Sequence, residues 1–333
     1  MPAATGGLLT CPNCGNAEVV TGSRFCDSCG KPMPMPTAAT AACGCGSTDF
    51  DGDGFCQNCG ARQRVRRAQE DAINLGDGLA GATDVGKRHT RNDDAFGAAG
   101  PAGGGVGSIF VVCDGVSSSQ AADIGSAAAA RVAMDSLTAA LATGTDARGA
   151  TREAILKAHD VVCTVPFDRQ GDVDPPASTI VTAVIRQGPG DTLEAVVGWL
   201  GDSRLYWLSR SGGKLLTRDH SIANARIDEG RGSEPLTSRQ AHAITKCLGT
   251  ADFGSPTPCP EPSVEVFGLP AEGWLLACTD GLWGYAETPA SLVLAANGKL
   301  WTAPAAEVCQ QFVGFARMRG GGDNITAVMA RLG

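Results

Sequence analysis

The feature that most restricts the fold is a series of short apolar or β-branched runs, each ended by Gly, Asp or Ser. Runs of this length and composition are typical of strands in a compact sheet. Six of them are predicted strands: residues 108–113, 179–186, 194–200, 204–209, 274–279 and 325–331. Apolar residues at helical spacing predict helices at 120–142, 152–165 and 305–317. Because the strands follow one another with helices grouped between them, the sequence favours an α+β fold over a βαβ repeat.

Aspartates stand at the end of several of these runs or just before the start of one. They are Asp93, Asp94, Asp114, Asp202, Asp280 and Asp323. A single Asp-Gly pair is usually a turn signal, but its repetition across one region favours a shared role. Side chains at strand ends lie at the rim of a sheet, where carboxylates can converge, and Mg²⁺ and Mn²⁺ prefer such oxygen ligands. The sequence therefore predicts a site for divalent metal ions.

The same residues belong to motifs that occur in a fixed order along the chain. These are DVG at 84–86, NDD at 92–94, VVCDG at 111–115, GDSR at 201–204, LTRDHS at 216–221, LG at 248–249, CTDGLW at 278–283 and DNIT at 323–326. From about residue 80 to its end, the chain thereby resembles the PPM family, the metal-dependent type 2C Ser/Thr protein phosphatases. The resemblance implies a β-sandwich of two antiparallel sheets flanked by helices (α-β-β-α), with metal ions in a channel at one end.

The resemblance also implies a role for the central residues of these motifs. Asp114 would bridge two Mn²⁺ or Mg²⁺ ions, and Gly115 would give its carbonyl to one of them. Asp280 and Asp323 would complete the other. Such a pair lowers the pKa of a shared water, which would attack the phosphorus of phosphoserine or phosphothreonine.

Three further aspartates are implied to act around the two ions. Asp93 and Asp94 would hold metals or their waters, and Asp94 is also a candidate catalytic residue. Where the family usually has Glu, this chain has the shorter Asp93, which implies a contact through water. Asp202 resembles the ligand of a weaker third ion.

Two departures from the family pattern concern the substrate. Many relatives have an arginine that grips the substrate phosphate at the position of His89, and here Arg88 and Arg91 are close by in sequence. His89 and Arg88 are therefore candidate catalytic residues. Some relatives carry a histidine after the Asp-Gly pair, whereas this chain has Val116 followed by three serines. A catalytically weak or degenerate domain that acts as a signalling or binding module remains the alternative.

Eight of the 14 cysteines fall within the first 60 residues, in four close pairs. The pairs are Cys11 and Cys14, Cys26 and Cys29, Cys43 and Cys45, and Cys56 and Cys59. Eight thiolates suffice for two tetrahedral sites, and metal would supply the folding free energy of so small a unit. The sequence predicts a double zinc-ribbon-like module at 1–60 with two structural Zn²⁺ ions, a linker at 61–80 and a phosphatase domain at 81–333. Iron of the rubredoxin type stays open as an alternative.

The charge balance bears on partners and location. The chain has 27 Lys and Arg against 35 Asp and Glu, a net charge of −8, which disfavours a nucleic-acid partner. Its apolar runs are shorter than the ~20 residues of a membrane span, and its first residues lack the features of a signal peptide. We expect a cytoplasmic protein that acts on phosphorylated proteins without a membrane or nucleic acid. The resemblance alone adds Ser/Thr kinases and their substrates as partners.

Overall fold

The computed structural model describes residues 70–101, 106–168, 174–190, 192–232, 235–237, 240, 243–249 and 259–333, together with 8–9, 19–20 and 58. The chain divides into two compact units, Met1–Arg66 and Arg67–Gly333. In the first unit, β1 (Leu8–Leu9) pairs with β2 (Val19–Val20) in a short antiparallel ladder. The eight cysteines predicted to bind zinc lie outside the described residues, so the zinc module stays a prediction.

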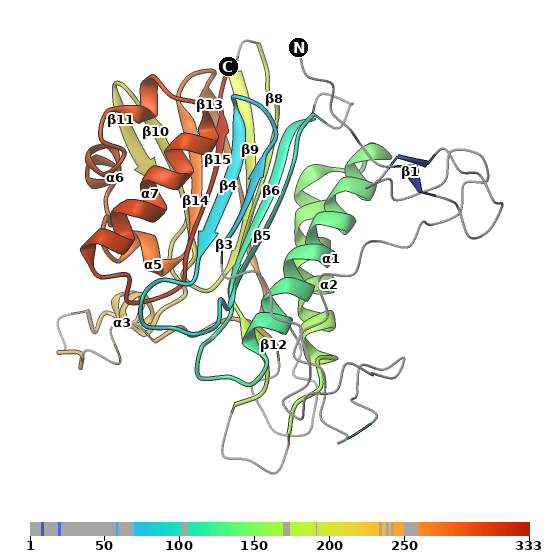
Figure 1. Ribbon diagram of the computed structural model, residues 1–333, viewed down its shortest axis with the longest axis vertical. Coiled ribbons are helices and arrows are strands. Elements are labelled where there is room, and N and C mark those ends of the chain that lie inside the picture. The colour runs from blue at the N-terminus through green and yellow to red at the C-terminus, as the bar shows by residue number, and fades with distance from the viewer. Residues whose placement is uncertain are drawn as a thin grey trace. The chain divides into compact units, whose positions relative to one another are not determined.

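Two antiparallel sheets form the centre of the second unit (Figure 1). The five-stranded sheet has the order β13 (Ser263–Pro270), β9 (Thr192–Leu200), β8 (Ile180–Gln187), β6 (Val106–Asp114) and β5 (Asp94–Ala99). The six-stranded sheet has the order β11 (Gly212–Leu215), β10 (Arg204–Ser209), β14 (Trp274–Cys278), β15 (Ile325–Arg331), β4 (Leu79–Asp84) and β3 (Glu70–Asn74). A two-stranded ladder joins β7 (Ala177–Ser178) to β12 (Leu248–Gly249).

Alternating side chains bury both faces of the central strands, as the period of two in a β-strand requires. On β6, Phe110 and Val112 pack into the core between the two sheets, while Ile109 and Val111 pack on the opposite face. All four are fully buried, and each such side chain stabilises the fold by roughly 1.5–3 kcal/mol. The result is a sandwich whose sheets hold each other in a fixed orientation.

Helices cover the two outer faces. The Ala-rich α1 (Ala122–Ala142) and α2 (Ala147–Cys163) pack on the five-stranded sheet. Gly198 of β9 permits close packing, because a Cβ there would lie 2.4 Å from the Thr151 side chain. The six-stranded sheet is covered by α5 (Asp280–Trp283), α6 (Pro289–Ala295), η1 (Lys299–Trp301) and α7 (Ala305–Arg319). A short helix, α3 (Ile222–Asp228), follows β11. These layers confirm the predicted α-β-β-α arrangement.

The six predicted strands and three predicted helices are all present, with ends shifted by a few residues. In the second unit, the described elements that were not predicted include strands β3, β4, β5, β7, β11, β12 and β13 and helices α3, α5 and α6. Strand β3 and the first residues of β4 fall within 61–80, the range predicted to be a linker, and both belong to the six-stranded sheet. None of the described helices is long and apolar enough to cross a bilayer.

Candidate metal centre

The strand ends that carry the predicted aspartates meet at corresponding edges of the two sheets. In the five-stranded sheet, Asp94 at the start of β5 pairs with Asp114 at the end of β6. In the other sheet, Cys278 at the end of β14 pairs with Arg204 at the start of β10, and Ile325 at the start of β15 pairs with Asp84. Because neighbouring strands are antiparallel, one strand ends where the next begins. Residues distant in sequence are thereby brought to one place.

Asp94 lies among these strand ends and is almost fully buried. Its Oδ2 accepts hydrogen bonds from the hydroxyls of Thr279 (2.9 Å), which directly follows β14, and of Thr326 (2.7 Å) in β15. Its Oδ1 is buried and has no hydrogen-bond partner among the described residues. Burial raises the pKa of Asp94 to about 8, in spite of the two hydroxyl donors. A buried carboxylate oxygen without a donor is costly unless a cation or a water serves it.

Burial and neighbouring carboxylates also raise the pKa values of Asp114 and Asp202. The pKa of Asp114 is raised well above 3.8, first by desolvation and then by the charges of Asp94, Asp280, Asp202 and Asp323. The pKa of Asp202 is raised to about 7, first by desolvation and then by Asp280. Both residues keep some solvent contact, although protein atoms surround their carboxyl groups closely. The four carboxylates of Asp94, Asp280, Asp202 and Asp323 therefore all lie near enough to raise the pKa of Asp114, and with it they form a group of five.

The carboxylates fit a hard divalent cation, because they are acceptor-only oxygen ligands and one of their buried oxygens lacks a donor. Within the described ranges, however, no three acidic, cysteine or histidine side chains are drawn into a ready coordination shell. Like charges repel one another where they are poorly solvated. Carboxylates that lie further apart than the ligands of a shared ion therefore agree with the raised pKa values. A cation would relieve the repulsion and draw the side chains together.

The predicted site glycine, Gly115, and Gly281 of the quoted CTDGLW motif occupy positions where no side chain fits. A Cβ on Gly115 would lie 2.7 Å from the carbonyl oxygens of Asp93 and Ala122, and one on Gly281 would lie 1.9 Å from that of Asn324. The amide of Gly115 donates to the Asp93 carbonyl (3.1 Å). The turns after Asp114 and Asp280 therefore pack directly on neighbouring backbone. This packing fixes the backbone positions from which both carboxylate side chains extend.

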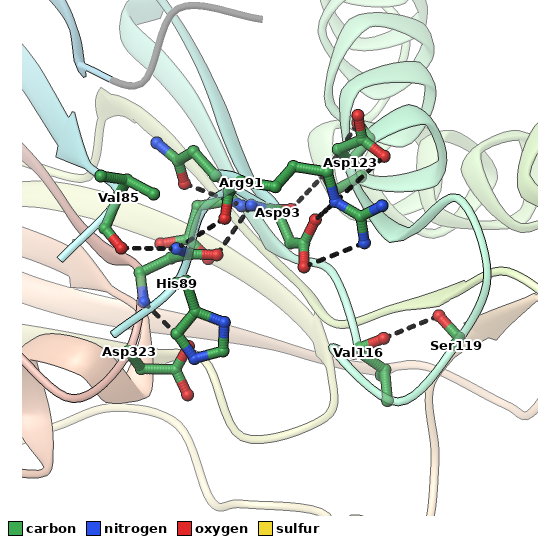
Figure 2. A network of polar contacts seen from close by, with 12 residues as sticks. Val85, His89, Arg91, Asp93, Val116, Ser119, Asp123 and Asp323 are labelled. Carbon is green, nitrogen blue, oxygen red and sulfur yellow. Dashed lines mark hydrogen bonds and ion pairs between the residues drawn. The ribbon is translucent and has the colours of Figure 1, made fainter. Parts of the chain in front are cut away.

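Asp93 does not point into the group of five carboxylates. Its Oδ1 lies 2.5 Å from Nε of Arg91 and its Oδ2 lies 3.3 Å from Nη2 of the same side chain. Arg91 also lies 3.5 Å from Asp123, in the first turn of α1. Figure 2 shows both carboxylates turned toward the guanidinium group. Burial raises the pKa of Asp93, and the ion pair with Arg91 acts against that rise.

The other basic side chains of the same loop, Arg88 and His89, differ in their surroundings. His89 Nε2 lies 3.3 Å from Oδ1 of Asp323 (Figure 2). Arg88 is exposed, and its Nη1 lies 3.9 Å from the position that a Cβ of Gly322 would take. Within the described part of the chain, the Arg88 side chain makes no ion pair. The structure thus places Arg88 and His89 beside the Asp323 turn, and Arg91 apart from them.

A sequence profile described as protein phosphatase 2C matches residues 81–290. The chain belongs to the protein phosphatase 2C family. It is a protein serine/threonine phosphatase, which confirms the predicted class of enzyme.

Individual relatives agree with this assignment. The serine/threonine phosphatase stp of Listeria monocytogenes is 26% identical over 228 residues, which are 66% of this chain and 83% of the relative. The structure of the PPM Ser-Thr phosphatase MsPP from Mycobacterium smegmatis, in complex with cacodylate, is 27% identical, with a TM-score of 0.54 over 78% of this chain and 99% of its own. The PstP catalytic domain, solved with two manganese ions, has 23% identity and a TM-score of 0.53, over 79% of this chain and 97% of its own. The last likeness shows the fold alone.

Some residues that shape the site of this phosphatase were not singled out from the sequence. Arg204 is buried, forms an ion pair with Asp219 at 2.7 Å and stacks 3.8 Å from the ring centre of Trp283. The indole of Trp283 in turn donates to the carbonyl of Asp202 (3.0 Å). This stack ties the turn of Asp202 to α5, the helix that begins at Asp280. Arg204 and Trp283 both lie in motifs quoted above, so the signal was present without an assigned role.

Proposed function

We propose that this chain hydrolyses phosphoserine and phosphothreonine in proteins at a binuclear Mn²⁺ or Mg²⁺ centre. The observation that carries the proposal is the group of carboxylates at the strand ends, where burial and neighbouring charges raise the pKa values of Asp94, Asp114 and Asp202. Within the described residues, Oδ1 of Asp94 is buried there without a hydrogen-bond donor. Divalent ions bound there would lower the pKa of the attacking water and neutralise phosphoryl oxygens. The test is phosphate release from phosphoserine and phosphothreonine peptides before and after chelation, and after Mn²⁺ is restored.

Each carboxylate has a distinct part in this proposal. Asp114 would bridge both ions, Asp280 and Asp323 would complete one ion, and the carbonyl of Gly115 and Asp93 would serve the other. Asp202 would hold a weaker third ion. The side chains of Asp114 and Asp280 start from turns fixed by backbone packing, so few torsions separate them from a common ion.

Asp94 would orient the water. Thr279 and Thr326 hold its Oδ2, which leaves Oδ1 to accept a hydrogen bond from the water as it approaches phosphorus. If the domain showed no metal-dependent turnover, the alternative would apply, namely a degenerate phosphatase domain that acts as a signalling or binding module.

Arg88 is the best placed of the three nearby basic side chains to bind the substrate phosphate. His89 already pairs with Asp323, and Arg91 with Asp93. Arg88 is exposed beside the Asp323 turn and can present two parallel N–H groups to a phosphate.

Arg88→Gln is therefore expected to lower kcat/KM for a phosphopeptide by about 10- to 100-fold, mainly through KM, because one charge-assisted contact is lost. Steady-state kinetics with saturating Mn²⁺ measure this effect. Lys87→Gln removes one exposed charge from the adjacent position and is the matched control, with an expected change below about twofold. Equal kinetics for both variants would assign phosphate binding elsewhere.

We further propose that the eight cysteines of residues 1–60 bind two structural zinc ions. The spacing of the four pairs supports this proposal. Protein purified without chelators should contain two zinc ions per chain by mass spectrometry of metals, and Cys11→Ser with Cys14→Ser should reduce this to one. Cys163→Ser, outside the module, should leave the count at two. Iron, or the absence of bound metal, would contradict the assignment.

The proposed physiological setting rests on the family resemblance and on the composition of the chain. The substrates would be cytoplasmic phosphoproteins, among them Ser/Thr kinases and their targets. The net charge of −8 supports a role that does not depend on nucleic acid.

A further inference from the structure

Arg91 engages both oxygens of the Asp93 carboxylate in a forked ion pair (Figure 2). The side chain of Asp93 is only 5% exposed, whereas that of Arg91 is 47% exposed. The fork therefore covers a buried carboxylate from the solvent side. An ion pair with two parallel N–H donors is among the stronger polar contacts in proteins.

The backbone on either side of this pair is held firmly. The amide of Asp93 donates to Oδ1 of Asn324 (2.7 Å), and the Asp93 carbonyl accepts from Gly115 N (3.1 Å) and Ser126 Oγ (2.5 Å). Nδ2 of Asn324 donates to the Arg91 carbonyl (3.1 Å). With both backbones fixed, Asp93 can change partner only by a movement of side chains.

The charges around Arg91 favour its present position. Nε of Arg91 lies 2.5 Å from Asp93 and 3.5 Å from Asp123. One guanidinium group therefore offsets part of the negative charge of two carboxylates. The pKa of Arg91 is raised, chiefly by its hydrogen bond to Asp93 and against the effect of its burial. A second cation approaching Asp93 would meet a positive charge already in contact with both oxygens.

We propose that Arg91 is an internal competitor for the metal ion at Asp93, so that the phosphatase binds its second ion much more weakly than its first. This inference rests on the proposed binuclear centre. Before Asp93 can serve an ion, directly or through water, Arg91 must release at least one oxygen. Because Arg91 is half exposed, it can turn toward solvent, where water replaces the lost hydrogen bonds. At the first ion, with Asp114, Asp280 and Asp323, the neighbouring basic group is the imidazole of His89, whose Nε2 lies 3.3 Å from one oxygen of Asp323, so it opposes the ion less than a fork that engages both oxygens.

The test is calorimetric titration of the full chain with Mn²⁺ after treatment with EDTA. Asp202→Asn is present in every sample, because it removes the proposed third ion. With Arg91 intact, we expect one tight and one weak ion. With Arg91→Gln, the second ion should bind at least about tenfold more tightly, while the first is unchanged. Arg91→Lys keeps the charge without the fork and should fall between the two. Lys87→Gln, which removes a charge from the same loop, should leave both affinities as they were.

Two equal affinities with Arg91 intact, or a second ion that binds no better in Arg91→Gln, would overturn the inference. Weaker binding of the second ion in Arg91→Gln would also overturn it, because Arg91 would then support the site. Asp114→Asn separates this failure from that of the proposed function. If Asp114→Asn abolishes Mn²⁺ binding while Arg91→Gln has no effect, the metal centre stands and only the competition fails. If Asp114→Asn binds Mn²⁺ normally, the proposed centre itself is wrong. Thermal melting in EDTA checks that each variant is folded.

Discussion

Asp114→Asn is expected to lower Mn²⁺-dependent hydrolysis of a phosphothreonine peptide by at least about 10³-fold, and also to raise the melting temperature of the EDTA-treated protein. Activity falls because an amide cannot bridge two cations as a carboxylate does, so the attacking water loses its activation. Stability rises because the substitution removes a charge that is poorly solvated and repelled by Asp94, Asp280 and Asp202. The two effects have opposite signs, which is typical of a carboxylate placed for function and not for stability.

Initial rates of phosphate release and thermal melting in EDTA measure the two effects. Asp135→Asn makes the same chemical change on an exposed position of α1, and we expect it to alter neither quantity. Asp114→Asn protein that is folded and retains more than about a tenth of the activity would contradict the proposed centre. A melting temperature that falls would mean that Asp114 stabilises the fold through contacts other than those described above.

The sequence predicted those parts of the fold whose signal is local. An apolar strand followed by Asp-Gly is recognisable within a few residues, which is why β6 and β14 and their terminal aspartates were identified. Strand β4 was missed because Leu79–Asp84 consists mostly of small residues with weak β-propensity. Its burial comes from tertiary packing, as at Gly81, where a Cβ would lie 2.5 Å from the ring of Phe96.

The same distinction applies to the site. The order of the motifs predicted which residues form the metal centre. This was possible because the family that the chain resembles has these motifs at strand ends that converge in space. The direction of the Asp93 side chain could not be predicted. It depends on Asn324, Ser126 and Asp123, which fix the backbone and the charge around Arg91 from other elements. Neither composition nor spacing reveals that an arginine two residues away would engage both carboxylate oxygens.

The melting temperature of the EDTA-treated protein is expected to fall by several degrees between pH 6.5 and pH 8, and Mn²⁺ should reverse this fall. The pKa of Asp94 rises from 3.8 to about 8 in the folded protein and that of Asp202 to about 7, in both cases chiefly through desolvation. The folded state thus binds more protons than the unfolded state above pH 3.8. The stability that these groups contribute is fully present below that pH and is lost as the pH rises through the folded pKa values. Protons also compete with the metal for the same oxygens, so the stabilisation by Mn²⁺ should be larger at pH 8.

The range from pH 6.5 to 8 isolates the carboxylates from the main opposing group. Burial lowers the pKa of His220 from 6.5 to about 4, so the unfolded chain binds the extra proton there and stability increases with pH, but only up to about pH 6.5. Scanning fluorimetry in EDTA at several pH values measures the slope, and Asp94→Asn should make it shallower, because one of the strongly shifted carboxylates no longer titrates while Asp114 and Asp202 remain. A melting temperature in EDTA that stays level or increases from pH 6.5 to 8 would mean that Asp94 and Asp202 ionise freely in the folded protein. The carboxylates would then not be crowded enough to require a cation.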